Sequence, residues 1–371
     1  MSRRILVTGG AGFIGSHLVK HLAGLGDDVV VLDSLEAQVH LGKEPRFPRG
    51  VSFIHGDVGD PVVADRALED VEAVVHLAAA VGVGQSMYEI ERYVRINTYA
   101  TATFLERLVT RSPRPNRLVV ASSMSIYGEG EYRCPEHGSV APGLRSEEQL
   151  LARQWECVCP TCQAELTPIP TRESKPLIPT SVYAITKRDH EELCQVVGLA
   201  YGVATVALRF FNVYGPGQAL SNPYTGVAAI FSSRLLNDHA PLVFEDGLQS
   251  RDFVHVSDIV QAIVRALESD DAVGHAINVG TGRAVSVGKV AELIAAGLDK
   301  RIAPERPATY RAGDIRHCFA DPTRAEELLG FKAGIELEAG IGELMEWVRT
   351  QTATDLVDEA AAELIARRLV R

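Results

Sequence analysis

The first 120 residues alternate short apolar runs with stretches of helical spacing. Residues 5–7 are apolar and end at glycines, and residues 13–25 place apolar side chains on one face of a helix. Further apolar runs, each ending in small or polar residues, are residues 29–32, 51–54, 74–77 and 118–121. Continuous apolar strands separated by helices predict a parallel sheet covered on both faces. Ligands of such sheets bind at the carboxyl ends of the strands.

Two later segments depart from this pattern. Residues 129–180 are rich in Pro, Gly, Glu and Cys and carry little periodicity, which predicts an inserted subdomain. Regular α/β signals resume at residue 181, and the last third of the chain has shorter elements. Residues 355–370 predict an amphipathic helix.

Composition and charge exclude several classes of protein. The chain has 371 residues, 46% of them hydrophobic, which is enough for one large domain or two closely packed ones. No apolar run approaches the roughly 20 residues that a membrane helix needs. A signal peptide is not expected, because the first apolar run breaks at Thr8. The net charge of −11 provides no basic field for nucleic acid. We therefore expect a cytoplasmic protein that binds neither nucleic acid nor membrane.

A glycine-rich turn follows the first predicted strand and opens a helix. Gly9, Gly12 and Gly15 allow a tight turn and a close approach of a pyrophosphate to the helix N-terminus. Asp33 ends the second strand, where a carboxylate bonds ribose hydroxyls and repels a 2′-phosphate, so the pattern favours NAD over NADP. The alternatives are a loop for another phosphate ligand or a structural turn, and Asp57 could be an ordinary strand-end cap. We assign to the cofactor site Gly9, Gly12, Phe13, Ile14, Gly15, Asp33, Asp57, Val58, Leu77, Ala78, Ala79 and Asn97, together with Tyr183 and Lys187.

Three residues form a candidate catalytic group. Tyr183 and Lys187 are four residues apart and share a helix face, so the lysine charge is expected to lower the tyrosine pKa and make it a general base. Ser123, at the end of a strand, can bond the reacting alcohol. The alternative is a half-buried helical tyrosine with a solvated lysine and a capping serine.

Together these motifs resemble the extended short-chain dehydrogenases/reductases, and more narrowly the NAD-dependent nucleoside-diphosphate-sugar epimerases and dehydratases. The matching segments are TGGAGFIG at 8–15, HLAA at 76–79, the serines at 122–123, the Tyr-x-x-x-Lys pair, and residues 209–216, 251–256 and 311–315. The resemblance implies NAD as cofactor, a nucleoside-diphosphate sugar as substrate, and a homodimer built on the helix that carries Tyr183. It also implies a set of substrate contacts, namely Ser86, Ser123, Asn212, Asn222, Arg251, Arg311 and Asp314.

The two residues that follow Ser123 reduce the number of reactions that this resemblance allows. The 4,6-dehydratases that the chain resembles carry Asp-Glu there and the decarboxylases carry Glu at the second, whereas this chain has Met124 and Ser125. Neither is a good acid or base at neutral pH. We expect a 4-epimerase that forms a transient 4-keto sugar, resembling the enzymes that act on dTDP-L-rhamnose or UDP-glucose, with a dTDP- or UDP-linked hexose as substrate. The alternatives are a 4,6-dehydratase, a decarboxylase, a 4-keto reductase, and a non-catalytic NAD-binding scaffold or sensor.

The insertion contains two C-x-x-[CH] pairs with 21 residues between them. Cys134 and His137, then Cys159 and Cys162, have the spacing of a structural zinc ribbon, and Cys157 could replace His137. The alternative is a set of reduced cysteines without metal.

The expected fold is therefore α/β, a Rossmann-type doubly wound parallel sheet with a smaller C-terminal substrate-binding region and an inserted Cys-rich subdomain. We divide the chain into residues 1–128 and 181–210 for the NAD-binding Rossmann domain, 129–180 for the insertion, 211–350 mainly for substrate binding, and 351–371 for a C-terminal helix.

Overall fold

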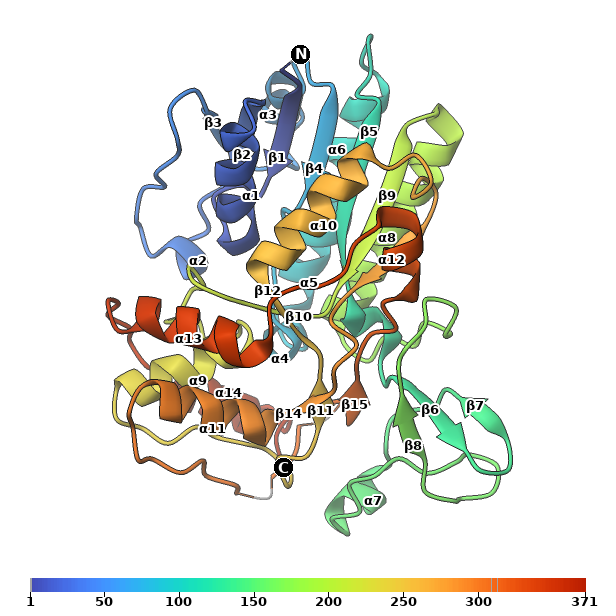
Figure 1. Cartoon of the computed structure of the whole chain (residues 1–371), viewed down its shortest axis with the longest axis vertical. Coiled ribbons are helices and arrows are strands. Elements are labelled where there is room, and N and C mark those ends of the chain that lie inside the picture. Colours follow the sequence, from blue (N-terminus) through green and yellow to red (C-terminus); the bar gives the residue numbers. More distant parts are fainter. Residues whose placement is uncertain (1, 308, 312) are drawn as a thin grey trace.

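The computed structural model describes residues 2–307, 309–311 and 313–371. Its centre is a seven-stranded sheet in the order β13-β9-β5-β4-β1-β2-β3, and all six pairings are parallel (Figure 1). The strands are β1 (Arg4–Thr8), β2 (Asp28–Asp33), β3 (Ser52–His55), β4 (Ala73–His76), β5 (Arg117–Ser123), β9 (Ala204–Phe210) and β13 (Ala276–Val279). This confirms the doubly wound parallel sheet predicted from the apolar runs.

Helices cover both faces of this sheet because its strands are apolar on both sides. Ile5 and Val7 of β1 point into a core shared with one set of helices, whereas Leu6 between them points into the core of the opposite set. The first set is α1 (Phe13–Gly24), α10 (Val256–Glu268) and α12 (Thr323–Leu329). The second set is α3 (Pro61–Ala67), α6 (Ala100–Val109) and α8 (Val182–Tyr201).

A second apolar core lies toward the carboxyl ends of the strands, in the lower left of Figure 1. Its helices are α9 (Val227–Leu236), α11 (Val287–Gly297) and α13 (Leu337–Val348). Short strands accompany them, namely β10 (Asn212–Tyr214) beside β12 (Phe253–His255), and β11 (Ser250–Arg251) between β14 (Val285–Ser286) and β15 (His317–Cys318).

The range 211–350 is divided between the two parts of the molecule. Strand β13 and helices α10 and α12 belong to the central sheet and its cover, although they follow residue 210 in the sequence. A four-residue strand shows too little periodicity to be assigned to one sheet from its sequence. The boundary expected at residue 210 is therefore not a boundary in space.

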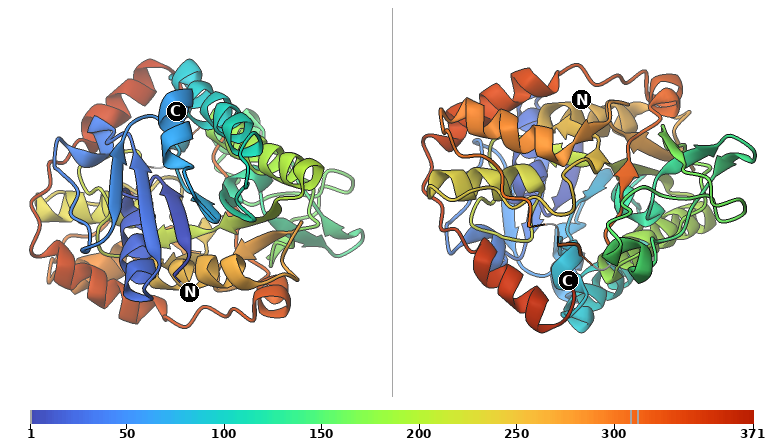
Figure 2. Two further views of the ribbon diagram at one scale, coloured as in Figure 1. Left: turned by 90° about the horizontal axis from the view of Figure 1, so that it is seen from above. Right: turned by 90° about the horizontal axis from the view of Figure 1, so that it is seen from below.

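The insertion forms a small unit beside the main body, seen at the lower right of Figure 1 and at the right edge of the right-hand view in Figure 2. It has a three-stranded antiparallel sheet in the order β7-β6-β8. Its elements are β6 (Glu131–Cys134), β7 (Gly138–Val140), α7 (Glu147–Leu151) and β8 (Thr167–Ile169).

Short elements at the strand ends and the C-terminal helix complete the fold. They are α2 (Ala37–His40), α4 (Val83–Ser86), α5 (Ile90–Tyr93), the π-helical turn η1 (Val94–Tyr99), the 3₁₀ turn η2 (Met124–Tyr127) and α14 (Val357–Ala366). The sequence predicted the last of these over residues 355–370. After α14 the chain end pairs with Tyr310 through two backbone hydrogen bonds of 2.9 and 3.0 Å with Arg371. Among the described residues, no helix is long and apolar enough to cross a membrane.

Candidate active site

The glycine-rich turn between β1 and α1 leaves no room for side chains. Gly9 has φ +69°, and a Cβ there would lie 2.8 Å from the backbone nitrogen of Ala78. A Cβ on Gly15 would lie 2.3 Å from the carbonyl oxygen of Gly9. Gly12 precedes α1 without a side-chain cap, so the first N–H groups of the helix are free to meet an anion.

A cavity of about 980 Å³ runs from this turn to the second core. Asp33 lines it, and its carboxylate accepts hydrogen bonds from Ala11 N at 3.0 Å and Leu35 N at 2.9 Å, which orients it beside the glycine turn. Asp57 also lines the cavity and accepts a hydrogen bond from Gly59 N at 2.8 Å, so it is a strand-end cap as well as a wall residue. The other predicted cofactor residues on the wall are Gly9, Gly12, Phe13, Ile14, Gly15, Val58, Leu77, Ala78, Ala79, Tyr183 and Lys187.

Two predicted site residues lie behind the wall of the cavity. Asn97, predicted to bind the cofactor, is fully buried, bonds both backbone groups of Ala80 and donates to Thr186 Oγ1 at 3.0 Å. Ser86, predicted to contact the substrate, is also fully buried and accepts a hydrogen bond of 3.0 Å from Tyr183 N. In this structure both residues position α8 and the loop after β4, and neither lines the cavity.

The structure brings the three predicted catalytic residues to one place on the cavity wall. Ser123 ends β5, and Tyr183 and Lys187 lie in the first turns of α8, whose N-cap Ser181 accepts a 3.1 Å hydrogen bond from Ala184 N. The Ser123 hydroxyl accepts a 2.9 Å hydrogen bond from Ser125.

The electrostatics of Tyr183 differ from the expected arrangement. Burial raises the pKa of Tyr183, and a hydrogen bond with Ser123 opposes this increase. Lys187 Nζ donates instead to the carbonyl oxygen of Ala121 and, at 2.9 Å, to His190 Nδ1. Burial also lowers the pKa of Lys187 to about 8. In this geometry the Lys187 ammonium group bonds other acceptors, and the pKa of Tyr183 is raised by burial.

His190 is a residue that the sequence reasoning missed. It lies three residues after Lys187 on the same helix face, and that spacing was the available signal. Its ring stands edge-on to His76, with centroids 4.5 Å apart, and His76 Nδ1 lies 2.6 Å from Thr8 Oγ1 at the start of the glycine turn. Burial lowers the pKa of both histidines, that of His76 to about 3, so both rings are neutral behind Lys187.

The far end of the cavity is positively charged. Arg251 and Arg311 both line it, and burial, with a smaller contribution from the charge of Arg251, lowers the pKa of Arg311. The Arg311 guanidinium lies 4.3 Å from the ring centre of Phe244, and among the described residues its Nε has no hydrogen-bond partner. Asp314 offers one carboxylate, 3.3 Å from Arg251. Two guanidinium groups with one carboxylate favour an anionic ligand.

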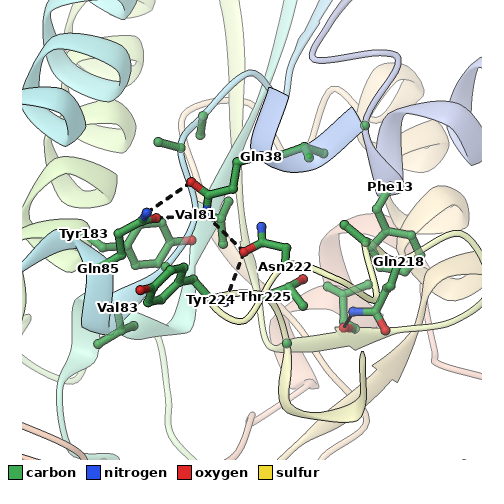
Figure 3. A pocket seen from close by; sticks show the side chains of 18 of the residues that line it. Phe13, Gln38, Val81, Val83, Gln85, Tyr183, Gln218, Asn222, Tyr224 and Thr225 are labelled. Carbon is green, nitrogen blue, oxygen red and sulfur yellow. Dashed lines mark hydrogen bonds between the residues drawn. The ribbon is translucent and has the colours of Figure 1, made fainter. Parts of the chain in front are cut away.

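Hydrogen bonds cross the cavity between these two ends (Figure 3). Gln38 of α2 donates to Gln85 Oε1 and to Asn222 Oδ1, each at 3.1 Å, so side chains from three separate segments meet there. Asn222, predicted as a substrate contact, thus lines the cavity but is hydrogen-bonded to Gln38. Asn212, also predicted as a substrate contact, lines the cavity too, and among the described residues its Oδ1 has no hydrogen-bond partner. The sequence offered no signal for these contacts of Gln38, since Gln85 and Asn222 lie 47 and 184 residues away.

The four predicted metal ligands of the insertion converge. The ligand atoms of Cys134, His137, Cys159 and Cys162 all lie within 4.8 Å of one another. Cys134 Sγ is 3.5 Å from His137 Nδ1 and 3.6 Å from Cys162 Sγ, close to the roughly 3.4–3.8 Å edges of a tetrahedral zinc site. Cys157 is not in this group, because its thiol donates to the Tyr132 hydroxyl at 3.4 Å.

The chain matches known proteins over most of its length. The model of the NAD dependent epimerase/dehydratase family matches residues 5–146 and 156–280, and the gap lies inside the insertion. A dTDP-L-rhamnose 4-epimerase of Burkholderia thailandensis is 35% identical, with 93% of this chain and 95% of that protein covered. A putative UDP-glucose 4-epimerase of Methanocaldococcus jannaschii is 30% identical over 94% of this chain and 100% of that protein.

Solved structures that resemble this chain carry the same kind of name as these relatives. The UDP-glucose 4-epimerase of Thermotoga maritima with UDP-glucose has a TM-score of 0.76 and 30% identity, with 93% of this chain and 98% of that chain covered. The UDP-glucose 4-epimerase of Thermus thermophilus in complex with NAD has a TM-score of 0.74 and 30% identity over 94% and 100%. The family indicated by the motifs is confirmed: the chain belongs to the NAD dependent epimerase/dehydratase family.

Proposed function

We propose that this protein is an NAD-dependent 4-epimerase of a nucleoside-diphosphate hexose. The observation that carries the proposal is the cavity itself, which has a glycine turn at one end, Ser123 and Tyr183 on its wall, and two arginines at the other end. Met124 and Ser125 also line it, at the two positions where the related dehydratases and decarboxylases carry acids. Hydride transfer at one carbon, with proton transfer at its hydroxyl oxygen, is therefore supported, and elimination is not.

The residues present fit NAD. The close approaches of Gly9 and Gly15 make a cradle that any Cβ would fill, the uncapped start of α1 suits a pyrophosphate, and Asp33 is oriented to accept ribose hydroxyls. Lys187 would hold the nicotinamide ribose. NAD, when bound there, supplies a reversible hydride acceptor at C4 of the sugar, and its positive charge favours the Tyr183 phenolate.

The chain's own residues then move one proton twice. Tyr183 Oη removes the proton of the sugar 4-hydroxyl, and Ser123 hydrogen-bonds the oxygen that becomes the 4-keto group. Rotation of the 4-keto sugar in the cavity presents its other face, and Tyr183 returns the proton to the same oxygen. The product is the C4 epimer, and protons and electrons balance over the cycle.

The positive end of the cavity supports a nucleoside diphosphate as the carrier of the sugar. Arg251 and Arg311 would pair with the diphosphate, and Asp314 would accept the ribose hydroxyls. Relatives named for dTDP-linked and UDP-linked sugars support a dTDP- or UDP-linked hexose.

We also propose one structural zinc ion in the insertion. Four ligands of nitrogen and sulfur type at tetrahedral spacing leave no open position for chemistry, so the role of the ion would be to stabilise the fold. Metal analysis of protein purified without added zinc should give about one equivalent per chain. Less than about half an equivalent, with all thiols titratable, would support the alternative of reduced cysteines without metal.

A homodimer through α8 is the proposed assembly. Ile185, Val196 and Leu199 are exposed on one stripe of α8, and Val94 and Tyr99 are exposed on the neighbouring η1. Leu199 is 88% exposed, and together these apolar side chains form a patch of the kind that marks protein–protein interfaces. Light scattering should give a dimer mass for the native protein and a monomer mass for Leu199→Asp.

A panel of UDP-, dTDP- and GDP-sugars incubated with the purified protein and no added cofactor tests the activity. NMR of the products should show the C4 epimer approaching an equilibrium mixture, without net reduction of cofactor. A 4-keto-6-deoxy product would indicate a dehydratase, and a pentose product a decarboxylase. A requirement for added NADPH would indicate a reductase. No product from any sugar, with NAD bound, would indicate a scaffold or sensor.

A further inference from the structure

The insertion reaches the segment that follows the positively charged end of the cavity. Glu129, at the start of the insertion, is 2% exposed, and its carboxylate accepts hydrogen bonds from Arg316 N at 2.7 and 2.9 Å and from His317 N at 3.3 Å. The Tyr132 hydroxyl donates to the same carboxylate at 2.9 Å. Through Glu129, the insertion thereby fixes the backbone N–H groups of residues 316 and 317.

The backbone carbonyl groups of this segment contact Arg251, a proposed substrate-binding residue. Arg251 Nη1 donates to the carbonyl oxygen of Arg316 at 2.9 Å, and its Nη2 donates to that of Ile315 at 2.7 Å. The Asp314 carboxylate lies 3.3 Å from Arg251. Residues 314–317 therefore lie between the insertion and the cavity arginine, and a shift of this segment moves the guanidinium of Arg251.

Buried ion pairs also connect the insertion to residues 314–317. Arg316 has no exposed surface, and its guanidinium pairs with Glu245, Asp246 and, from the insertion, Glu156. Arg145 of the insertion pairs with Glu245 at 2.8 Å and donates to the carbonyl oxygen of Asp314 at 3.3 Å. Removing one partner of a buried pair leaves an uncompensated charge and is strongly destabilising.

The proposed zinc site is linked to these contacts over a short distance. Cys157 lies two residues before the ligand Cys159, and its thiol donates to the Tyr132 hydroxyl, which in turn donates to Glu129. Cys134 ends β6, the strand that carries Tyr132. The insertion has few apolar residues in its core, namely Tyr132, Cys134, Cys157, Cys159 and Leu166, so its shape depends on what holds the cysteines together.

We propose that the insertion is a metal-dependent support for the diphosphate end of the active site, with Glu129 and Arg145 as positioning residues for Arg251 and Asp314. The inference rests on the proposed nucleoside-diphosphate ligand and the proposed zinc ion. Loss of zinc would weaken binding of the nucleotide sugar, whereas NAD would remain bound, because the glycine turn and Asp33 lie on the other side of the cavity.

Binding of dTDP and of UDP to the NAD-loaded protein, measured by titration calorimetry, tests this without the need for turnover. The variant is Glu129→Gln. The matched control is Glu131→Gln, two residues away in the same strand region, whose carboxylate bonds Arg172 and Ser139 within the insertion and does not contact residues 314–317. We expect the Kd to rise at least about tenfold in Glu129→Gln and to stay within about twofold in the control. With the preferred sugar, KM should rise by a similar factor and kcat should change less than about threefold.

Two further arms keep the test decisive if Glu129→Gln folds poorly. Arg145→Met should raise the same Kd, and zinc depletion of the wild-type protein by a chelator should do so as zinc is lost, with the NAD content of all samples unchanged. An unchanged Kd in the folded variants and in zinc-depleted protein would overturn the inference, as would loss of NAD in parallel with the nucleotide. Wild-type protein that binds neither dTDP nor UDP would contradict the proposed function itself, which separates the two failures.

Discussion

The NAD-binding half and the insertion of this protein are held together by different forces. In the half that holds the glycine turn, the side chains of Ile5, Leu6 and Val7 have no exposed surface and pack into cores on both faces of the sheet. In the insertion, three of the five buried core residues are cysteines. Burial of apolar surface stabilises the first region at about 25 cal/mol per Å². The second has too little such surface and depends on a cluster of thiols and on buried ion pairs.

The two regions also hold different parts of the proposed chemistry. Ser123, Tyr183 and Lys187 extend from β5 and α8 of the rigid sheet, whereas Arg251 and Asp314 lie on short strands and loops that the insertion contacts. A rigid core suits groups that must keep sub-ångström geometry for proton transfer. A region held by buried ion pairs and by the proposed zinc ion suits a binding surface whose affinity can change without loss of the reaction. Perturbations of one region should therefore leave the other intact.

The largest effect is expected from Tyr183→Phe, which changes only the sheet half. Loss of the proton acceptor should reduce turnover by about 10³-fold or more, with NAD and zinc contents unchanged. NMR of the products measures turnover, and analysis of the nucleotide released from denatured protein measures the NAD content. The control is Tyr93→Phe, a buried tyrosine whose ring lies 6.4 Å from that of Tyr183, and it should keep activity within about threefold. More than a tenth of wild-type activity in Tyr183→Phe would place the general base elsewhere.

Zinc removal should loosen the insertion and the diphosphate end of the cavity that it supports, and should leave the sheet half intact. Because the insertion lacks a large apolar core, chelation should raise its rate of proteolysis by about 100-fold or more, and cleavage sites should map within residues 129–180. Mass spectrometry of the fragments gives the positions. The fragments on both sides of the insertion are expected to stay intact and together to keep bound NAD after cleavage. Equal cleavage in both halves would show that the two regions are not stabilised independently.

The free energy of unfolding should depend on pH through Lys187, which is buried in the sheet half. Burial lowers the pKa of Lys187 from 10.5 to about 8, so between these values the unfolded chain binds more protons than the folded one and stability rises with pH. Below about pH 8 the buried charge costs about 3 kcal/mol, a penalty that Lys187→Met removes. The free energy of unfolding of Lys187→Met minus that of the wild type should therefore be larger at about pH 7 than at about pH 9.5. Denaturant titrations at equal NAD content measure this difference, and equal values at both pH would mean that the lysine is not desolvated.

The smallest effect is expected from the hydrogen bonds that cross the cavity. Gln38→Ala removes the contacts with Gln85 and Asn222, and the exchange of bound NAD should become about threefold faster. Exchange against isotope-labelled NAD measures the rate, with the exposed Gln163→Ala in the insertion as the control. A slower exchange would mean that these bonds compete with NAD.

Several features could be predicted because each lies within one local element. The spacing of Gly9, Gly12 and Gly15, the position of Asp33 and the Tyr183–Lys187 pair depend only on the geometry of a strand, a turn and a helix. The Cys134–His137 and Cys159–Cys162 pairs were recognisable for the same reason, since a C-x-x-[CH] turn brings its two side chains together. The family followed from these local patterns.

Other features depend on which segments pack together, and no local pattern encodes that. Asn97 and Ser86 were predicted at the cavity, but the packing of α8 against the loops after β4 turns them behind its wall. Lys187 is directed to Ala121 and His190 by its neighbours in the folded protein. The sequence alone determined the glycine turn, the Tyr183–Lys187 pair and the two C-x-x-[CH] pairs of the insertion, because covalent spacing sets those geometries. Only the tertiary structure decided that Glu129 meets Arg316, 187 residues away, because buried charges find partners through the packing of the whole chain.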